Sequence, residues 1–294
     1  MISFLQRFWQ YQQERFPLLV LMATTSAVVF SSAGVQQVTV TGHGWQFVAA
    51  IFLGLTLLFT MRVLDERRDF THDNTYHQDR PLQRGLITFK ELYACNTILV
   101  IIALCSLLLL GVIPFIIGLC TFLFCLVAGR DFFLHRYLKH HFLFYNAVNL
   151  LQMFGVQLLI YAVLDSSFSL SSSLLWLHFI FAILNSVLLE IVRKIKPPAE
   201  ESNGNDTYSW RLGFRGAILL YTIMVLCVLM FYVICIKELG ALFSLWSIVV
   251  LFATCVTLLI ALLYNYKRVA ILESCLIGAT VCLYLLFHFS FYFL

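Results

Sequence analysis

The chain has 294 residues, of which 61% are hydrophobic and only 12% are charged. Soluble domains carry about 25% charged residues, so this composition excludes an ordinary soluble protein and predicts an integral membrane protein in a lipid bilayer. The formal net charge of +4 arises from basic residues spread over several segments between apolar stretches, which gives no reason to expect nucleic-acid binding.

Apolar stretches of about 20 residues, long enough to cross a bilayer, recur along the whole chain. They predict an all-α, polytopic membrane protein with nine transmembrane helices, at residues 17–34, 46–64, 92–110, 112–128, 142–164, 173–192, 213–236, 241–264 and 270–292. Only Gly111 to Pro114 separates the third span from the fourth. Because proline is tolerated inside membrane helices, a count of eight is the alternative.

Basic residues lie before the first predicted span and after the even-numbered spans, with Lys237 as the exception. Short cytoplasmic loops are enriched in Lys and Arg, so this distribution predicts a cytoplasmic N-terminus and a C-terminus on the opposite side. Labelling of both termini from one side of the membrane would contradict it.

The first acidic loop, residues 65–91, directly follows the second predicted span. Asp65, Asp69 and Asp73 are spaced four apart, which on a helix places them within about 80° of one another. Glu66 flanks that face. Carboxylate oxygens are the ligands that Mg²⁺ prefers, usually with phosphate oxygens completing its octahedron.

Arginines accompany these acids. One interpretation is a solvated helix end whose acids are neutralised by Arg67 and Arg68. However, charges next to a membrane span are costly and usually functional, and Arg80 and Arg84 follow on a turn-forming segment that can fold back over phosphate. The combination favours a substrate that bears a diphosphate, held through Mg²⁺ and guanidinium groups.

The second long inner loop, residues 191–212, begins beside Glu190 and contains Lys194. These two residues stand at i and i+4, which is also the spacing of an intrahelical salt bridge worth a few tenths of a kcal/mol. The functional interpretation makes Glu190 a metal ligand facing the first acidic row and places Lys194 on the diphosphate.

Asn146, Asn149, Gln152 and Gln157 lie on one side of the fifth predicted span. In hydrocarbon a polar face is normally turned inward. Hydrogen bonding between helices is one role for it, and lining of a substrate pocket by Asn146 and Asn149 is the other.

The remaining metal-binding residue types give no pattern. Nine cysteines are scattered singly, so we expect them to pack as small hydrophobic residues. No pair of inner-side histidines predicts a zinc or iron site, and we expect these residues at the surface: His72, His77, His135, His140 and His141.

The stretch from Arg62 to Gly85 resembles the first aspartate motif of the UbiA superfamily of intramembrane prenyltransferases. That motif reads N-D-x-x-D-x-x-x-D and is followed by D-R-P, a basic residue and Gly. The corresponding residues here are Asp65-Glu66-x-x-Asp69-x-x-x-Asp73, Asp79-Arg80-Pro81 and Arg84-Gly85. Asp69 and Asp73 match outright, whereas Asp65 stands at the family's Asn and Glu66 at its first Asp, and both substitutions keep an oxygen ligand.

The resemblance implies a single domain over residues 1–294, with its helices around a central cavity that opens toward the cytoplasm. Residues 1–192 would hold six helices and the first acidic loop, and residues 193–294 the second acidic loop and three helices. The implied metal ligands for Mg²⁺ are Asp65, Glu66, Asp69, Asp73 and Glu190. The implied catalytic residues are Asp69, Asp73 and Lys194, and the implied substrate-binding residues include Arg62, Arg68, Arg80, Arg84 and Lys194.

The second acidic loop departs from the family pattern. An insertion, "IKPPAEESNGN", follows Lys194. Which of Glu200, Glu201 and Asp206 replaces the missing acid therefore stays open.

Three functions are compatible with these features. The leading hypothesis is Mg²⁺-dependent transfer of a prenyl group from a polyprenyl diphosphate to a lipophilic, aromatic acceptor. A terpene cyclase would ionise the same diphosphate but needs no acceptor. A cation transporter is disfavoured, because transporters usually place their coupling sites at mid-membrane and these acids lie in inner loops. No oligomeric state follows from the sequence.

Overall fold

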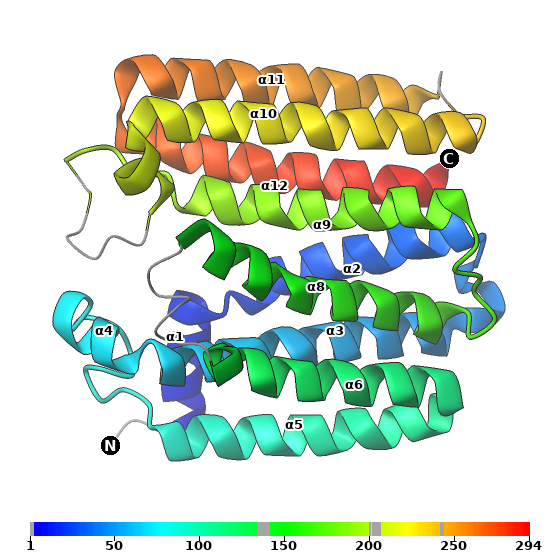
Figure 1. Cartoon of the computed structure of the whole chain (residues 1–294), viewed down its shortest axis with the longest axis horizontal. Coiled ribbons are helices and arrows are strands. Elements are labelled where there is room, and N and C mark those ends of the chain that lie inside the picture. Colours follow the sequence, from blue (N-terminus) through cyan, green and yellow to red (C-terminus); the bar gives the residue numbers. More distant parts are fainter. Residues whose placement is uncertain (1–2, 134–141, 200, 202–206, 242–243) are drawn as a thin grey trace. The chain divides into compact units, whose positions relative to one another are not determined.

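The computed structural model of the chain describes residues 3–133, 142–199, 201, 207–241 and 244–294, with the backbone alone for residues 142–149. Helices and connecting segments make up this described part, which contains no strand (Figure 1). The predicted all-α class is confirmed. By their internal contacts, the residues group into two compact units.

The first unit comprises residues Met1–Val29 and Thr39–Phe168. Within it, α3 packs against α5 and α8, and α6 packs against both of those helices. Its helices are α1 (Phe4–Arg15), most of α2 (Leu18–Gln36), α3 (Val40–Arg68), α4 (Phe70–Tyr76), α5 (Phe89–Leu110), α6 (Val112–Ala128), the short 3₁₀ helix η1 (Asp131–Phe133) and α8 (Phe142–Leu164).

The second unit comprises Phe30–Val38, which includes the end of α2, and Ser169–Leu294. Within it, α9 packs against α10 and α12, and α11 packs against the same two helices. Its helices are α9 (Ser173–Arg193), α10 (Tyr208–Glu238), α11 (Leu245–Lys267) and α12 (Ala270–Phe293).

Each predicted span coincides with a helix. In the described residues, seven helices are long and apolar enough to cross a membrane: α2, α3, α5, α9, α10, α11 and α12. The other two, α6 and the stretch 150–164 of α8, are shorter apolar helices. Large apolar side chains such as Leu109, Phe252 and Ile271 are exposed on these helices, as expected for surfaces that face lipid. The protein is therefore an integral, multi-pass membrane protein.

The third and fourth predicted spans are separate helices. Gly111 ends α5 with a φ of +117°, in the left-handed region that favours glycine. Pro114 falls in the first turn of α6, where its missing N–H costs nothing. The two helices pack closely, since a Cβ on Gly118 would lie 2.4 Å from Leu107 Cδ1. The chain therefore forms two helices here, and no single helix continues through Pro114.

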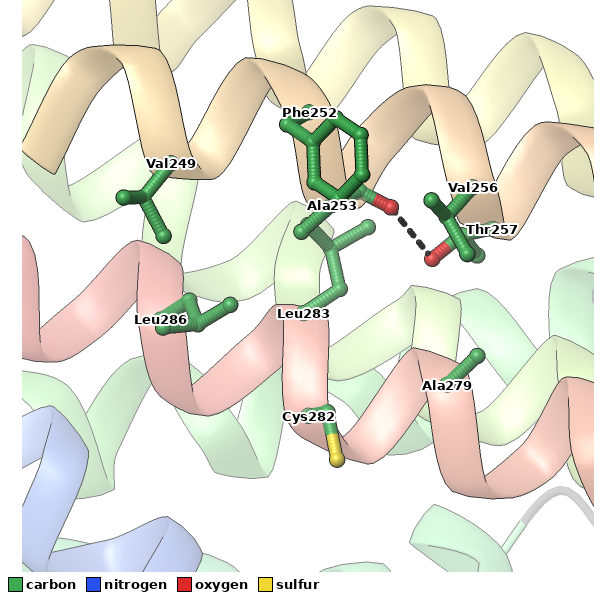
Figure 2. A pocket seen from close by; sticks show the side chains of 9 residues that line it. All are labelled: Val249, Phe252, Ala253, Val256, Thr257, Ala279, Cys282, Leu283 and Leu286. Carbon is green, nitrogen blue, oxygen red and sulfur yellow. Dashed lines mark hydrogen bonds between the residues drawn. The ribbon is translucent and has the colours of Figure 1, made fainter.

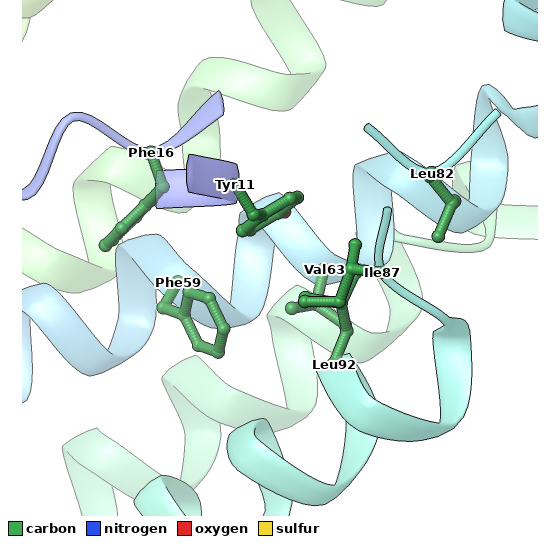
Figure 3. Packing of buried hydrophobic residues seen from close by; sticks show 7 residues of the cluster. All are labelled: Tyr11, Phe16, Phe59, Val63, Leu82, Ile87 and Leu92. Atoms are coloured by element: carbon green, nitrogen blue, oxygen red, sulfur yellow. The ribbon is translucent and has the colours of Figure 1, made fainter. Parts of the chain in front are cut away.

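A cluster of buried apolar side chains fixes the loop that follows α3 (Figure 3). Burial of each large side chain of this kind stabilises the fold by roughly 1.5–3 kcal/mol. Outside the cluster, Arg7 of α1 forms a 2.6 Å ion pair with Glu91 and donates to the carbonyl oxygen of Leu86. The amphipathic N-terminal helix and the first acidic loop are thus held together on α3. The members of the cluster are Tyr11, Phe16, Phe59, Val63, Leu82, Ile87 and Leu92.

Candidate functional site

The first acidic row lies where α3 passes into α4. Asp69 separates the two helices with φ −89° and ψ 0°. Its backbone N–H still donates to the carbonyl oxygen of Asp65, and the N–H of Asp73 donates to the carbonyl oxygen of Asp69, both at 2.9 Å. The four-residue spacing therefore sits on a nearly continuous helical backbone, as predicted.

Arg68 lies between the carboxylates of Asp65, Asp69 and Asp131. We call these four residues the Arg68 cluster. The guanidinium nitrogens of Arg68 lie 2.8 Å from Asp65 Oδ1, 3.2 Å from Asp69 Oδ1 and 3.6 Å from Asp131 Oδ1. The side chains of Asp65 and Asp69 are 35% and 46% exposed, whereas Asp131 is buried. Asp65 and Asp69 thus offer carboxylate oxygens that a cation from solvent can reach.

Glu66 and Asp73 belong to a second, buried ion-pair cluster, and each side chain is only 1% exposed. Glu66 Oε1 accepts from Arg15 Nε at 2.8 Å and lies 3.0 Å from Arg62 Nη2. Asp73 pairs closely with Arg80 and lies 3.8 Å from Arg15 Nη2. Buried charges of this kind persist only because they are paired. The structure thus separates the predicted acids into an accessible pair and a buried pair.

Helix α1 supplies two groups to this buried cluster, Arg15 and Tyr11. Burial, reinforced by the like charge of Arg62, lowers the pKa of the Arg15 guanidinium. Burial, with Glu66 adding a repulsive contribution, raises the pKa of the Tyr11 hydroxyl well above its usual range. Even with this lowered pKa an arginine remains protonated. Arg15 is therefore a permanent positive partner of Glu66. Sequence reasoning did not assign it, because 51 positions separate the two residues.

Asp131 is a second residue that sequence reasoning missed. It begins η1, in which all three residues have left-handed φ angles of 51°, 52° and 60°. Such conformations cost roughly 1–3 kcal/mol each for residues other than glycine. The close approach of this turn to α3 depends on Gly129, because a Cβ there would lie 2.8 Å from Leu64 Cβ. The packing of α6 on α3 places Asp131 beside Arg68.

Arg84 makes hydrogen bonds to residues outside the Arg68 cluster. It makes two hydrogen bonds to the carboxylate of Glu14, at 2.6 and 3.0 Å, and a third to the carbonyl oxygen of Asp79. The guanidinium lowers the pKa of Glu14, and the carboxylate in turn raises the pKa of Arg84. Both side chains are about one-third exposed, so the pair contributes at most about 1 kcal/mol.

In the second unit, Glu190 forms a 2.8 Å ion pair with Lys194 and a close pair with Arg193. The i,i+4 salt bridge considered from the sequence is therefore present. Lys194 ends α9 and belongs to the turn that follows it. The ion pair holds the side chains of Glu190 and Lys194 at the C-terminal end of α9. Their roles in binding metal and diphosphate stay predictions.

The other acids of the second loop differ in their surroundings. Glu201 Oε2 accepts a 2.7 Å hydrogen bond from Thr207 Oγ1, which also caps α10. Glu200 and Asp206 lie outside the described residues. Glu273, which sequence reasoning missed, is buried at the start of α12, where it pairs with Lys196 and accepts from the Tyr264 hydroxyl.

The polar face of the fifth predicted span is partly described. Gln152 and Gln157 of α8 are buried, as predicted for side chains turned away from lipid. Asn146 and Asn149 belong to the same helix, but their side chains lie outside the described residues.

An apolar groove of about 270 Å³ lies between α11 and α12 (Figure 2). The Thr257 hydroxyl in its lining donates to the carbonyl oxygen of Ala253 in its own helix, at 2.8 Å. No lining residue is charged, so this groove has no means of binding a diphosphate. Its lining residues are Val249, Phe252, Ala253, Val256, Thr257, Ala279, Cys282, Leu283 and Leu286.

The sequence profile of the UbiA prenyltransferase family matches residues 16–291 of this chain. That match includes both acidic loops and every predicted span except the last residue of the ninth. No curated protein sequence gives a significant match.

Two solved structures are similar in fold. The apo structure of a UbiA homolog from Aeropyrum pernix K1 has a TM-score of 0.63 and 16% identity, and the match covers 90% of this chain and 94% of that one. A structure reported for digeranylgeranylglyceryl phosphate synthase in membranes has a TM-score of 0.58 and 13% identity, with 97% and 99% covered. At these identities the likeness is one of fold.

Proposed function

Because this chain belongs to the UbiA prenyltransferase family, we propose that it transfers a prenyl group from a polyprenyl diphosphate to a lipophilic, aromatic acceptor in a Mg²⁺-dependent reaction. Enzymes of this family typically use metal ions with diphosphate substrates. The observation that carries the proposal is the pair of accessible carboxylates, Asp65 and Asp69, beside the guanidinium of Arg68.

The donor set suits a hard cation. Asp65 and Asp69 offer accessible carboxylate oxygens, which Mg²⁺ prefers. Asp73 Oδ2 accepts no hydrogen bond within the described part of the chain, although Arg15 lies 3.8 Å away. We therefore propose these three residues as the principal ligands, with Glu66 and Glu190 as the further acids of the set. Bound Mg²⁺ would take up negative charge that develops on the departing diphosphate.

The arginines that pair with these acids have a complementary role in the proposal. A guanidinium presents several donors in a fixed plane, which matches the oxygens of a phosphate. Arg62, Arg68 and Arg80 each have a carboxylate neighbour that orients them. They would bind diphosphate oxygens, together with Arg84 and Lys194. Pre-oriented donors cost little reorganisation as charge develops during ionisation.

The fate of the allylic cation distinguishes the transferase from a cyclase. Exclusion of water protects such a cation from hydrolysis. An external aromatic acceptor would capture the cation, whereas a cyclase would use the substrate's own double bond.

We further propose nine membrane crossings, with the N-terminus and the acidic loops on the cytoplasmic side. Asn146 and Asn149 are proposed as polar groups on the acceptor side.

The purified full-length protein tests the proposal directly. With Mg²⁺, a radiolabelled prenyl diphosphate and a lipophilic aromatic acceptor, we expect a prenylated acceptor and released diphosphate. Chelation of divalent ions should abolish both. A terpene formed without acceptor would favour the cyclase, and the absence of diphosphate release with a series of prenyl chain lengths would contradict both activities.

A double-mutant cycle separates the two roles considered for Glu190 and Lys194. We expect Glu190→Gln to raise the Mg²⁺ requirement and Lys194→Met to weaken diphosphate binding, so that the losses in turnover multiply in the double variant. Arg193→Gln is the matched control, because it removes the other cation paired with Glu190 from an exposed position. Steady-state turnover at several Mg²⁺ concentrations provides the readout. A double variant no worse than either single one would reduce the pair to a structural salt bridge.

A further inference from the structure

His72, Asp73 and His77 come together beside the buried ion-pair cluster. One possible ligand atom from each side chain lies within 4.8 Å of the others, and His72 Nδ1 is 3.5 Å from Asp73 Oδ1. The sequence-based expectation that the inner histidines include no such arrangement is therefore wrong for this pair. Two imidazoles and one carboxylate form a donor set that binds transition metals.

The end of α4 creates this arrangement. On a continuous helix, residues five apart would point about 140° away from each other. Here α4 ends at Tyr76, and His77 leaves the helix with φ −139° and ψ 52°, while its N–H donates to the carbonyl oxygen of Asp73 at 2.8 Å. The chain thus turns back, and the rings of His72 and His77 lie 5.8 Å apart between centroids.

The distances lie within the range that side-chain rotation can close. In a tetrahedral zinc site with bonds of about 2.0–2.1 Å, ligand atoms are about 3.3 Å apart. The pair His72 and Asp73 is already near that separation. His72 is 40% exposed, so an ion can enter from solvent, whereas the carboxylate of Asp73 is buried. Its Oδ1 faces His72 and also pairs with Arg80, and its Oδ2 accepts no hydrogen bond from the described residues.

We propose that His72, Asp73 and His77 bind a zinc ion, with water in the fourth position. The neighbouring charges help to select this metal. Arg80 pairs with Asp73 and Arg15 lies 3.8 Å from it, and both guanidiniums repel a cation that has no diphosphate oxygens and only this one carboxylate to hold it. Mg²⁺ depends on several charged oxygen ligands, whereas Zn²⁺ binds neutral imidazole nitrogens strongly. A site with one carboxylate and two imidazoles therefore favours Zn²⁺.

Occupancy of this site has a functional consequence, which rests on the proposed function. Asp73 is also a proposed Mg²⁺ ligand, and one carboxylate held by Zn²⁺ between two imidazoles is withdrawn from that role. Zinc would then inhibit prenyl transfer at concentrations far below those of Mg²⁺, through a site that shares only Asp73 with the proposed Mg²⁺ ligands.

Metal binding is measured first, without reference to activity. Tag-free, full-length protein in detergent is titrated with Co²⁺, whose visible absorption reports tetrahedral coordination, and the Co²⁺ is then displaced by Zn²⁺. We expect His72→Gln and His77→Gln each to weaken binding by about 100-fold or more, since even the loss of an outer-shell partner costs about 10- to 100-fold. His43→Gln is the matched control, because His43 is exposed and lies far from this group in the sequence.

The absence of a tetrahedral Co²⁺ spectrum, or binding that persists unchanged in both variants, would overturn the site. The second measurement is diphosphate release at saturating Mg²⁺ with added Zn²⁺. Inhibition of the wild type, and its loss in His72→Gln with turnover retained, supports the regulatory role. Zinc binding that leaves turnover unchanged would keep the metal site but remove Asp73 from the proposed reaction, so the two failures are distinct.

Discussion

Asp69→Asn is expected to lower Mg²⁺-dependent diphosphate release by about 100-fold or more, the range seen when a charge-stabilising group is removed from an active site. The substitution keeps the size of the side chain and removes the charge that holds a hard cation. Asp69 is 46% exposed and shares Arg68 with Asp65 and Asp131. Its loss should therefore leave the unfolding temperature in detergent nearly unchanged.

Two comparisons make this result specific. Asp165→Asn removes an acid whose carboxylate accepts hydrogen bonds from Ser167 in the described part of the chain, so its turnover should equal that of the wild type. Asp73→Asn should reduce both turnover and stability, because Asp73 is buried and paired with Arg80. An Asp69→Asn enzyme that keeps near wild-type turnover would remove this residue from the metal set.

Gly34→Ala is expected to destabilise the second unit by about 2–4 kcal/mol, near the upper end of overpacking costs. A Cβ at Gly34 would lie 2.1 Å from the backbone oxygen of Phe291 and 2.6 Å from its carbonyl carbon. Backbone atoms cannot rotate away as a flexible side chain can. The end of α2 and α12 would have to separate, and the packing around Phe291 would be lost with them.

Gly278→Ala is the matched control. Gly278 is also helical, in α12, but a Cβ there meets no atom within 4 Å. Replacement of a helical glycine by alanine gains up to about 1 kcal/mol in helix propensity, so this variant should be as stable as the wild type or more so. Chemical unfolding of both variants in the same detergent measures the difference. Equal stabilities would contradict the close approach of α2 to α12.

The sequence predicted the features that depend on residues close together in the chain. Apolar length placed each span, and the four-residue spacing placed Asp65, Asp69 and Asp73 on a helical backbone. Arg15 and Asp131 could not be found in this way, because each reaches the site through packing between helices that are distant in the sequence. No residue spacing encodes those approaches.

The grouping of the acids was also beyond the sequence. Glu66 and Asp69 lie close in the chain, yet one is buried against Arg15 and Arg62 while the other is accessible beside Arg68. The difference arises because α1 packs against only part of α3. It covers Glu66 and leaves Asp69 accessible. The approach of His72 to His77 likewise depends on where α4 ends.

The docking of the N-terminal helix has a practical consequence for anyone who expresses this protein. Arg7 holds Glu91, and Arg15 neutralises the buried Glu66, while Leu5 and Trp9 remain exposed on the same helix. A rigid fusion partner placed directly before Ser3 would compete with these contacts for the position of α1. Affinity tags at this end therefore need a long flexible spacer, and truncation to Pro17 would remove Arg15 and leave Arg62 as the remaining partner of the buried Glu66 among the described residues.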